Sequence, residues 1–467
     1  MELVSDFAKS RDSIIIAPAG YGKTNLIALA TAHHNSGHEL ILTHTNAGVY
    51  ALRNRLRQFG TDPNSYLVDT IAGWSLRYSA AYTSISGLVS FKPGVYGEWD
   101  DVYRGMIRLL DNSTIQEIIR RSYSGIYVDE YQDCLKSQHL IIRKLASIIP
   151  CRIVGDPLQG IFGFGQNQLA DWDSEVMTSF KKLGELDKPW RWANTNPELG
   201  QWLKMIRKNL INKEVIDLIS IPKTIHWIPL SDSVAQRKSY WKIGNNKNET
   251  TCIIHGGWEK QCHALARETG GYFNSLETIE CKDLLSWALE LDTSRGLKRV
   301  QVVCDFASEC CTGVKTILKD VTKRLTSKRR KMGSSLDEVF KLLDLVSNEE
   351  ILSHILPALE AIRQLEGVKL FRTELYYEMC RSLTEYSGGG EISLQDCAVI
   401  IRERTRQFGR RIAPRIVSRT LLIKGLEFDN CMIIGTDSLD RNNLYVALTR
   451  GAKTLTIVSQ KPMLNPN

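Results

Sequence analysis

Short runs of β-branched and apolar residues recur along this chain, and small or acidic residues follow each of them. The runs are SIII (13–16), LILT (40–43), IYV (126–128), RIV (152–154), CIIH (252–255), MIIG (432–435) and LTIV (455–458). Stretches with helical periodicity separate several of these runs. The alternation predicts an α/β fold with parallel sheets, in which functional groups gather at the carboxyl ends of the strands.

Two other segments interrupt this alternation. Residues 280–395 are mainly helix-like and end at the glycine run 388–390, and the shorter segment 86–118 contains Pro93 and Gly94. We therefore expect two α/β domains, with a small insertion in the first and a larger, mainly helical insertion in the second. The predicted boundaries are 1–85 and 119–188 for the first domain, 86–118 for its insertion, 189–279 and 396–467 for the second domain, and 280–395 for its insertion.

Composition narrows the class of protein. The 467 residues are 43% hydrophobic and 24% charged, which is typical of a folded globular chain, and the net charge of +8 favours polyanionic partners only mildly. The sequence lacks both an export signal and an apolar run of roughly 20 residues, so we expect a cytoplasmic protein without a membrane partner. Eleven cysteines without a CxxC pair indicate reduced thiols rather than a disulfide framework.

A phosphate-binding loop follows the first run. Its residues are Ala17-Pro18-Ala19-Gly20-Tyr21-Gly22-Lys23-Thr24, and a helix-like stretch comes next. The glycines let backbone N–H groups turn toward phosphates at the positive end of a helix, while Lys23 adds a mobile charge and the Thr24 hydroxyl suits Mg²⁺. The strict pattern has glycine at the position of Ala17. We predict that the loop binds a nucleoside triphosphate with Mg²⁺.

An acidic motif follows the buried run at 125–128. It reads Asp129-Glu130-Tyr131-Gln132-Asp133, and hydrolysis of a triphosphate requires such a pair of carboxylates. We assign Asp129 to the Mg²⁺ ion and Glu130 to the attacking water. The alternative is a solvated acidic turn, which the position of the motif after a buried strand makes the weaker interpretation.

Six further motifs occur along the chain, and the order in which they occur is as informative as their residues. They are Leu42-Thr43-His44-Thr45-Asn46, Asp69-Thr70-Ile71-Ala72-Gly73-Trp74, Gly155-Asp156-Pro157-Leu158-Gln159-Gly160-Ile161-Phe162, Pro189-Trp190-Arg191-Trp192, Lys424-Gly425-Leu426-Glu427-Phe428-Asp429 and Tyr445-Val446-Ala447-Leu448-Thr449-Arg450. With the phosphate loop as motif I and the acidic motif as motif II, they are similar to motifs Ia, Ib, III, IV, V and VI. The chain thus resembles the UvrD/Rep branch of the superfamily 1 helicases over nearly its full length.

The resemblance implies a role for each motif. Two RecA-like domains would bind ATP and Mg²⁺ in the cleft between them, with Gln159 of the first and Arg191 and Arg450 of the second reaching the γ-phosphate. Gly425 and Glu427 would join the ATP site. The implied DNA contacts are Thr45, Asn46, Thr70, Phe162, Phe164 and Lys424. For Arg191, a structural role in stacking against Trp190 and Trp192 remains the alternative.

The chain departs from the family pattern at several positions. Segment 1–16 contains no glutamine of the kind that reads adenine in relatives, so the preference for ATP comes from the resemblance alone. Ala47 and Ala72 replace a lysine of motif Ia and a histidine of motif Ib, and Phe164-Gly165 replaces a tryptophan and an arginine. These departures affect the DNA contacts and leave the ATPase residues complete.

Three functions fit the series. The first is an ATP-dependent 3′–5′ translocase or helicase acting on single-stranded or tailed DNA. The second is an ATPase subunit that senses nucleotide or DNA ends and regulates a partner nuclease. In size and class, this chain resembles the helicase partner of two-gene anti-phage systems such as Gabija. The third is an inactive ATPase kept as a scaffold, which the filled catalytic positions disfavour.

Two basic stretches lie outside the motifs, at 323–331 and 402–419. Either can pair with phosphates, and either can be an ordinary solvated face. The sequence leaves both alternatives open.

Overall fold

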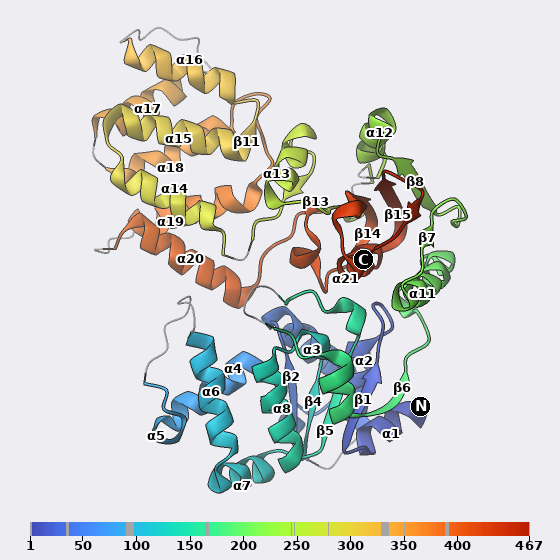
Figure 1. Cartoon of the computed structure of the whole chain (residues 1–467). Helices are drawn as coiled ribbons and strands as arrows, with labels where there is room; N and C mark the ends of the chain where they lie inside the picture. The colour runs from blue at the N-terminus through green and yellow to red at the C-terminus, as the bar shows by residue number, and fades with distance from the viewer. Residues whose placement is uncertain are drawn as a thin grey trace. The chain divides into compact units, whose positions relative to one another are not determined.

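The computed structural model describes residues 2–33, 37–89, 98–163, 168–243, 245–246, 248–278, 280–327, 336–349, 351–387 and 392–466. The chain divides into two compact units. Unit 1 comprises Met1–Ile216, Asp440–Lys453 and Asn465–Asn467, and unit 2 comprises Asp217–Leu439 and Thr454–Leu464. Each unit is built on one six-stranded sheet (Figure 1).

The sheet of unit 1 is parallel in every pair and has the strand order β3-β2-β4-β5-β1-β6. Its strands are β1 (Asp12–Ile16), β2 (Glu39–Thr43), β3 (Tyr66–Thr70), β4 (Gly125–Val128), β5 (Cys151–Gly155) and β6 (Lys181–Glu185). Helices α1 (Glu2–Lys9), α2 (Lys23–His33), α3 (Asn46–Gln58), α4 (Ile71–Ala81), α5 (Thr83–Ser86), α6 (Glu98–Leu110), α7 (Ser113–Ser122), α8 (Lys136–Ile148), α9 (Met177–Ser179), α10 (Trp190–Ala193), α11 (Pro197–Asn212) and α21 (Arg441–Leu448) complete the unit.

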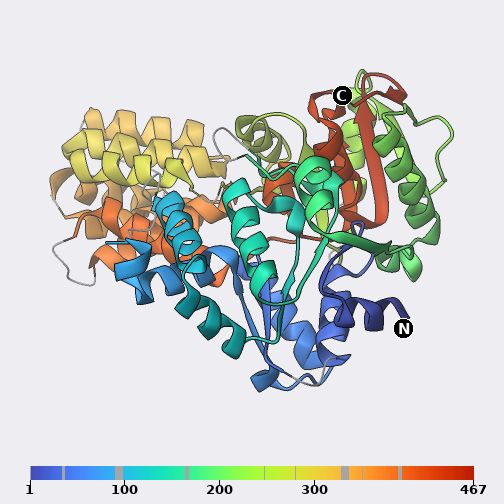
Figure 2. The ribbon, with the colours of Figure 1, turned by 60° about the horizontal axis from the view of Figure 1, so that its bottom comes forward.

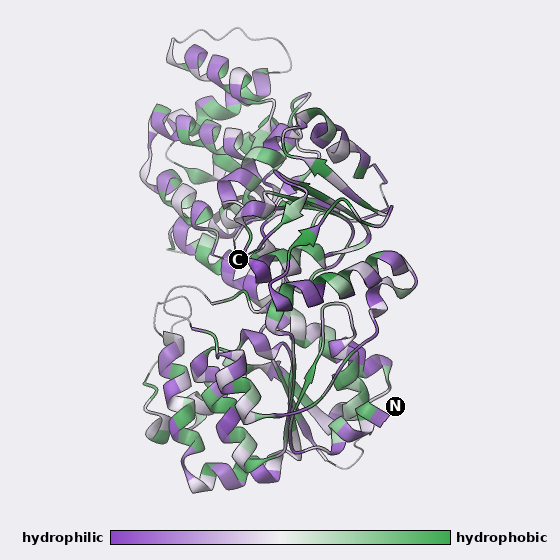
Figure 3. Ribbon diagram, turned by 45° about the vertical axis from the view of Figure 1, so that its right-hand side comes forward, coloured by the Kyte–Doolittle hydropathy of each residue, from purple (hydrophilic) through white to green (hydrophobic). Residues whose placement is uncertain are grey.

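The central strands of this sheet are apolar on both faces. Ile14 and Ile15 are neighbours in β1, and both are fully buried, one in each of two separate cores. A parallel sheet covered by helices on both faces explains why these strands read as continuous apolar runs rather than alternating ones. The covering helices are correspondingly mixed, with hydrophobic and hydrophilic residues interleaved along each of them (Figure 3).

Caps define where the helices of unit 1 begin. The Thr45 side chain accepts a hydrogen bond from the Gly48 N–H at α3, and Thr70 accepts one from the Gly73 N–H at α4. Asn196 caps α11, where proline occupies the first turn. Such caps satisfy N–H groups that lack partners inside the helix. Two of the capping residues, Thr45 and Thr70, are therefore fixed at the carboxyl ends of β2 and β3.

The sheet of unit 2 has the strand order β10-β13-β9-β14-β15-β8. Its strands are β8 (Ile225–Pro229), β9 (Thr251–His255), β10 (Asn274–Ser275), β13 (Arg415–Ser418), β14 (Phe428–Ile434) and β15 (Gly451–Ser459). The short strands β7 (Ile216–Asp217) and β16 (Met463–Leu464) pair with each other, as do β11 (Cys311–Thr312) and β12 (Lys369–Leu370). Helices α12 (Ser233–Ile243) and α13 (Glu259–Glu268) accompany the six-stranded sheet.

The rest of unit 2 is a helical layer that begins after β10. Its helices are α14 (Lys282–Thr293), α15 (Gly296–Cys310), α16 (Lys315–Thr326), α17 (Asp337–Asn348), α18 (Ile355–Arg363), α19 (Thr373–Ser387) and α20 (Leu394–Phe408). They pack side by side around their own apolar core, which includes Leu284, Phe306 and Leu359 (Figure 2). The helical character predicted for 280–395 thus continues through α20.

The predicted fold class is confirmed, because two parallel six-stranded sheets flanked by helices form the two units. The apolar-run pattern missed β3, β6, β8, β10 and β13. The division of the chain also differs from the expected one, since 189–216 and 440–453 join the unit of the phosphate loop. The boundaries predicted for the two domains and their two insertions stay a prediction. Among the described residues, no helix is both long and apolar enough to cross a bilayer, and the cytoplasmic location stays a prediction.

Candidate functional site

The sheet order of unit 1 brings three motifs to one edge. The phosphate loop follows β1, the acidic motif follows β4, and motif III follows β5, which lies between them. Because the strands are parallel, their carboxyl ends face the same side of the sheet, where ligands of open α/β sheets bind. This edge is the candidate site.

The backbone of the phosphate loop has the positive φ angles that its glycines allow. Gly20 and Gly22 have φ of 77° and 91°, a region that residues with a Cβ rarely adopt. A side chain at Gly20 would also come within 2.7 Å of the Trp192 ring. Lys23 begins α2, its side chain is buried, and the neighbouring Thr24 is half-buried. The loop therefore presents a helix N-terminus and an ammonium group to a phosphate.

The acidic motif lies within reach of this loop. Lys23 Nζ is 3.2 Å from Glu130 Oε2, and the Gln132 side chain donates a hydrogen bond of 2.5 Å to the same oxygen. Glu130 adopts a left-handed backbone with φ of 54°, which is unusual for a residue other than glycine. This strained turn directs the carboxylate toward the phosphate loop, so the structure brings Lys23 and Glu130 together, and their catalytic roles stay predictions.

Asp129 is only 4% exposed and lies next to Glu130. Burial, and then the negative charge of Glu130, raises the pKa of Asp129 to about 7, although Lys23 partly opposes the shift. Two carboxylates with one lysine leave negative charge in a buried place, which a divalent cation would neutralise. Together with the Thr24 hydroxyl, this donor set fits the predicted Mg²⁺ ion.

Motif III carries the predicted γ-phosphate sensor. Gln159 is buried in the short turn η3 (Pro157–Gln159), and its side chain donates to Asp156 Oδ2 at 2.9 Å. The side chain of Asn442, from α21, donates to the Gly160 carbonyl at 2.9 Å and to the Pro157 carbonyl at 3.4 Å. The motif III turn is thus held from both sides, by its own carboxylate and by α21.

The predicted arginines both lie in unit 1. The Arg191 N–H donates to the Gly20 carbonyl at 3.0 Å, and its guanidinium donates to the Thr449 carbonyl at 2.6 Å. Arg450 is 1% exposed, follows the end of α21, and donates to the Val446 carbonyl of that helix. The backbone N–H of Ala19 in the phosphate loop also donates to the Tyr445 hydroxyl at 3.3 Å. Motifs IV and VI therefore contact the phosphate loop directly.

The predicted DNA contacts of unit 1 lie along the neighbouring strands. Thr43 of β2 pairs with Thr70 of β3, so Thr45 and Asn46 follow one strand end beside the other. Thr45 and Asn46 are exposed, Thr70 and Phe162 are half-buried, and Phe164 lies outside the described residues. The N-termini of helices α3 and α4 therefore lie beside these residues, where they favour binding of the phosphates of a DNA backbone.

Motif V belongs to unit 2. Lys424 is half-buried and Gly425 and Glu427 are exposed in the connection that leads into β14. Gly425 has φ of 82°, which explains why this position is glycine. The roles predicted for these three residues stay predictions.

The structure also places three exposed aromatic residues that the sequence analysis did not include among the DNA contacts. Trp190 lies beside Gly22 and carries the Lys188 ammonium 3.6 Å from its ring centre. Tyr50 is exposed in the first turns of α3, and Trp258 is 76% exposed after β9. Exposed rings near strand ends suit base stacking. The signal for Trp258 was the Gly256-Gly257-Trp258 sequence directly after a buried strand.

Trp258 lines a cavity of about 370 Å³ in unit 2. The cavity is also lined by Gly256, Gly257, Gln261, Arg419 and Ser438. The Arg419 guanidinium lies 5.9 Å from the centre of the Trp258 ring. An aromatic face and a cation in one hollow can hold a nucleobase together with its phosphate.

Most of the basic stretch 402–419 has partners within the protein. Arg402 pairs with Glu374 and Glu378, and Arg404 pairs with Glu385. Further along, Arg406 pairs with Glu403, and Arg410 pairs with Glu374. These ion pairs favour the structural interpretation for this part of the stretch. In the other stretch, Arg324 pairs with Asp320, and residues 328–331 lie outside the described residues.

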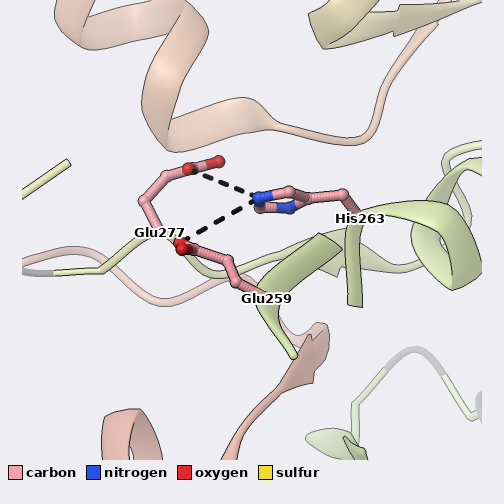
Figure 4. A group of neighbouring side chains, drawn as sticks. All are labelled: Glu259, His263 and Glu277. Atoms are coloured by element: carbon pink, nitrogen blue, oxygen red, sulfur yellow. Dashed lines mark ion pairs between the residues drawn. The ribbon is translucent and has the colours of Figure 1, made fainter. Parts of the chain in front are cut away.

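A second cluster of possible metal ligands lies elsewhere in unit 2. Glu259, His263 and Glu277 converge, with His263 Nε2 4.0 Å from an oxygen of each carboxylate (Figure 4). Arg372 already binds both oxygens of Glu277, at 2.9 and 2.6 Å. Burial, and then Arg372, lowers the pKa of His263 to about 4, so the imidazole is neutral. The cluster is therefore a buried ion-pair network, and we assign no metal to it.

Comparison with known proteins gives one family match. The family model of the UvrD/REP helicase N-terminal domain matches residues 96–172, which contain motifs II and III. The predicted family resemblance is confirmed. No curated protein matches the chain. Nothing in the match points to a nuclease partner or to the Gabija system, so the regulatory role stays a hypothesis.

Several solved helicase structures are similar to this chain, with low sequence identities and low TM-scores. The arterivirus nonstructural protein 10 helicase with DNA is 10% identical, with 98% of this chain and 62% of that one covered and a TM-score of 0.38. The Pif1 helicase from Candida albicans is 10% identical, with 99% and 93% covered and a TM-score of 0.43. The Bacteroides Pif1 helicase with ADP-AlF3 and single-stranded DNA is 15% identical, with 58% and 55% covered and a TM-score of 0.32. The chain thus spans 62% of the length of the arterivirus protein.

Proposed function

We propose that this chain is an ATP-dependent DNA helicase that translocates 3′ to 5′ along single-stranded DNA. The observation that carries the proposal is the convergence of Lys23, the pair Asp129 and Glu130, and Arg191 at the phosphate loop. This set contains a phosphate-binding cation, a metal ligand, a general base and an arginine for the developing charge, as phosphoryl transfer requires. The match to the UvrD/REP helicase N-terminal domain supports the helicase assignment, and the 3′–5′ polarity rests on the family resemblance of the motif series.

The residues of the site divide the chemistry among them. ATP with Mg²⁺, when bound, supplies the γ-phosphoryl group. The loop from Ala17 to Thr24 and Asp129 would hold this group, while Glu130 takes a proton from the attacking water. In the described contacts, Glu130 Oε2 is paired with Lys23 and Gln132. We expect Lys23 to turn from Glu130 to the phosphates, which leaves the Glu130 carboxylate able to accept the proton.

The proposal is tested by steady-state ATP hydrolysis with and without single-stranded DNA, and by unwinding of duplexes that carry a 3′ or a 5′ tail. We expect DNA to stimulate hydrolysis manyfold and only the 3′-tailed duplex to open. Unwinding of the 5′-tailed duplex alone would reverse the polarity and leave the ATPase assignment intact. Weak hydrolysis that DNA does not change would contradict the motor and favour the regulatory hypothesis.

The cavity at Trp258 gives a prediction for DNA affinity. Trp258→Ala should weaken binding of single-stranded DNA by about 1 to 3 kcal/mol, because a stacked base loses its aromatic platform. Fluorescence anisotropy of a labelled oligonucleotide measures the effect. Trp241→Ala is the matched control, since Trp241 is also exposed in unit 2 and instead packs against Tyr272. Equal losses for the two variants would contradict a specific role for the cavity.

The raised pKa of Asp129 predicts that, in the absence of metal, the ionisation of this residue makes the folded protein less stable as pH rises. The folded protein holds a proton that the unfolded chain releases at its ordinary pKa of 3.8, so this group contributes less stability as pH rises toward 7. Asp129→Asn should therefore melt at least about 2 °C above the wild type at about pH 8 in EDTA, with the difference shrinking toward about pH 5. A difference in melting temperature that does not vary with pH would contradict the assignment.

A further inference from the structure

Helix α11 contributes an arginine to the back of motif III. Arg207 is 7% exposed and bridges two carboxylates with its two terminal nitrogens. One nitrogen donates to Asp156 Oδ1 at 3.0 Å and the other to Glu185 Oε1 at 2.9 Å. Asp156 belongs to motif III and is 0% exposed, while Glu185 ends the edge strand β6. A buried aspartate is thereby neutralised by a residue outside every motif of the series.

Asp156 passes this contact on to two groups of the site. Its second oxygen accepts the Gln159 side chain at 2.9 Å, and its backbone N–H donates to Gln132 Oε1 at 2.9 Å. The Gln132 side chain in turn donates to Glu130. Arg207 therefore stands at the start of a continuous set of hydrogen bonds that reaches the predicted γ-phosphate sensor and the predicted general base.

We infer that Arg207 is a positioning residue, which fixes the amide of Gln159 by holding the Asp156 carboxylate in place. This role rests on the proposed ATPase function, and it makes Arg207 a residue that sets how the site distinguishes ATP from ADP. Gln159 has one side-chain amide nitrogen bonded to Asp156, so the orientation of that carboxylate fixes the orientation of the amide. Only a nucleotide with a γ-phosphate depends on that orientation.

Both the charge and the shape of the arginine matter. An unpaired carboxylate at a fully buried position is unstable, so without Arg207 either the Asp156 side chain or the motif III turn would move. Either change alters the acceptor for Gln159. Lysine keeps the charge, but its single nitrogen cannot span Asp156 and Glu185 as the fork of arginine does. Arg207→Lys therefore separates the geometry of the pair from its charge.

The experiment compares Arg207→Lys with wild type in two backgrounds, native and Gln159→Ala. In the native background we expect kcat for DNA-stimulated ATP hydrolysis to fall between about tenfold and a hundredfold, since small displacements of catalytic groups have effects of this size. Affinity for a nonhydrolysable ATP analogue should fall while affinity for ADP stays within about twofold. In the Gln159→Ala background, Arg207→Lys should change kcat by less than about twofold, because the group on which it acts is gone.

A matched control isolates the effect of weakening any buried ion pair. Arg152→Lys changes another buried arginine, which pairs with Glu39 near the beginning of β5 rather than at its carboxyl end. We expect this control to lower the melting temperature without changing the ratio of ATP-analogue to ADP affinity. Where Arg207→Lys does not fold, Arg207→Gln combined with Asp156→Asn replaces the ion pair by amides, and the same loss of kcat and of that ratio is expected.

The outcomes separate the inference from the function on which it rests. A wild-type protein that binds no nucleotide would overturn both. If the wild type hydrolyses ATP, unchanged kcat and nucleotide affinities in Arg207→Lys would overturn the inference alone. Equal effects of Arg207→Lys in the two backgrounds would also overturn it, because Arg207 would then act independently of Gln159.

Discussion

Glu130→Gln is expected to lower the rate of DNA-stimulated ATP hydrolysis by about 10²- to 10⁴-fold, the usual contribution of a positioned general base. Glutamine has nearly the shape of glutamate but cannot accept a proton from water. It also cannot form the ion pair with the Lys23 ammonium, which lies 3.2 Å from Glu130 in the wild type. Binding of ATP should therefore persist or strengthen. Single-turnover hydrolysis and equilibrium binding of ATP measure the two effects separately.

Lys23→Ala provides the complementary control. It leaves the carboxylate of Glu130 in place and removes the ammonium that we assign to the phosphates, so both ATP binding and turnover should be lost. A Glu130→Gln enzyme that hydrolyses ATP at the wild-type rate would exclude Glu130 as the base. A Lys23→Ala protein that binds ATP as the wild type does would place the nucleotide elsewhere in the chain.

The parts of the fold that could be predicted are those that the local sequence encodes. Strands such as β1 and β5 are buried on both faces, so their apolar runs are visible without any knowledge of their neighbours. The edge strand β6 has the sequence KKLGE, with both lysines exposed, and it exists because it pairs with β1. Its pattern gives no local signal, since the stability of an edge strand comes from its partner.

The same distinction applies to the site. Lys23 and Glu130 could be predicted because each belongs to a motif in which neighbouring residues carry the chemistry. Arg207 and Asn442 belong to no motif, and their contacts with motif III join positions far apart in the chain. Only the folded structure brings such residues together. For the arginine of motif IV, the motif predicted that an arginine occupies the position. It did not predict which groups the arginine contacts in the folded protein.

Those contacts make Arg191→Ala the second large expected effect. The Arg191 backbone N–H donates to the Gly20 carbonyl, and the guanidinium donates to the Thr449 carbonyl. A side chain tethered beside the phosphate loop can stabilise charge that develops on the γ-phosphoryl group, and loss of such an arginine lowers kcat by about 10³-fold or more. Stacking with Trp192, the structural alternative, predicts instead a lower melting temperature with kcat nearly unchanged. ATP hydrolysis and thermal unfolding measured together decide between the two roles, with the exposed Arg120→Ala on α7 as the control.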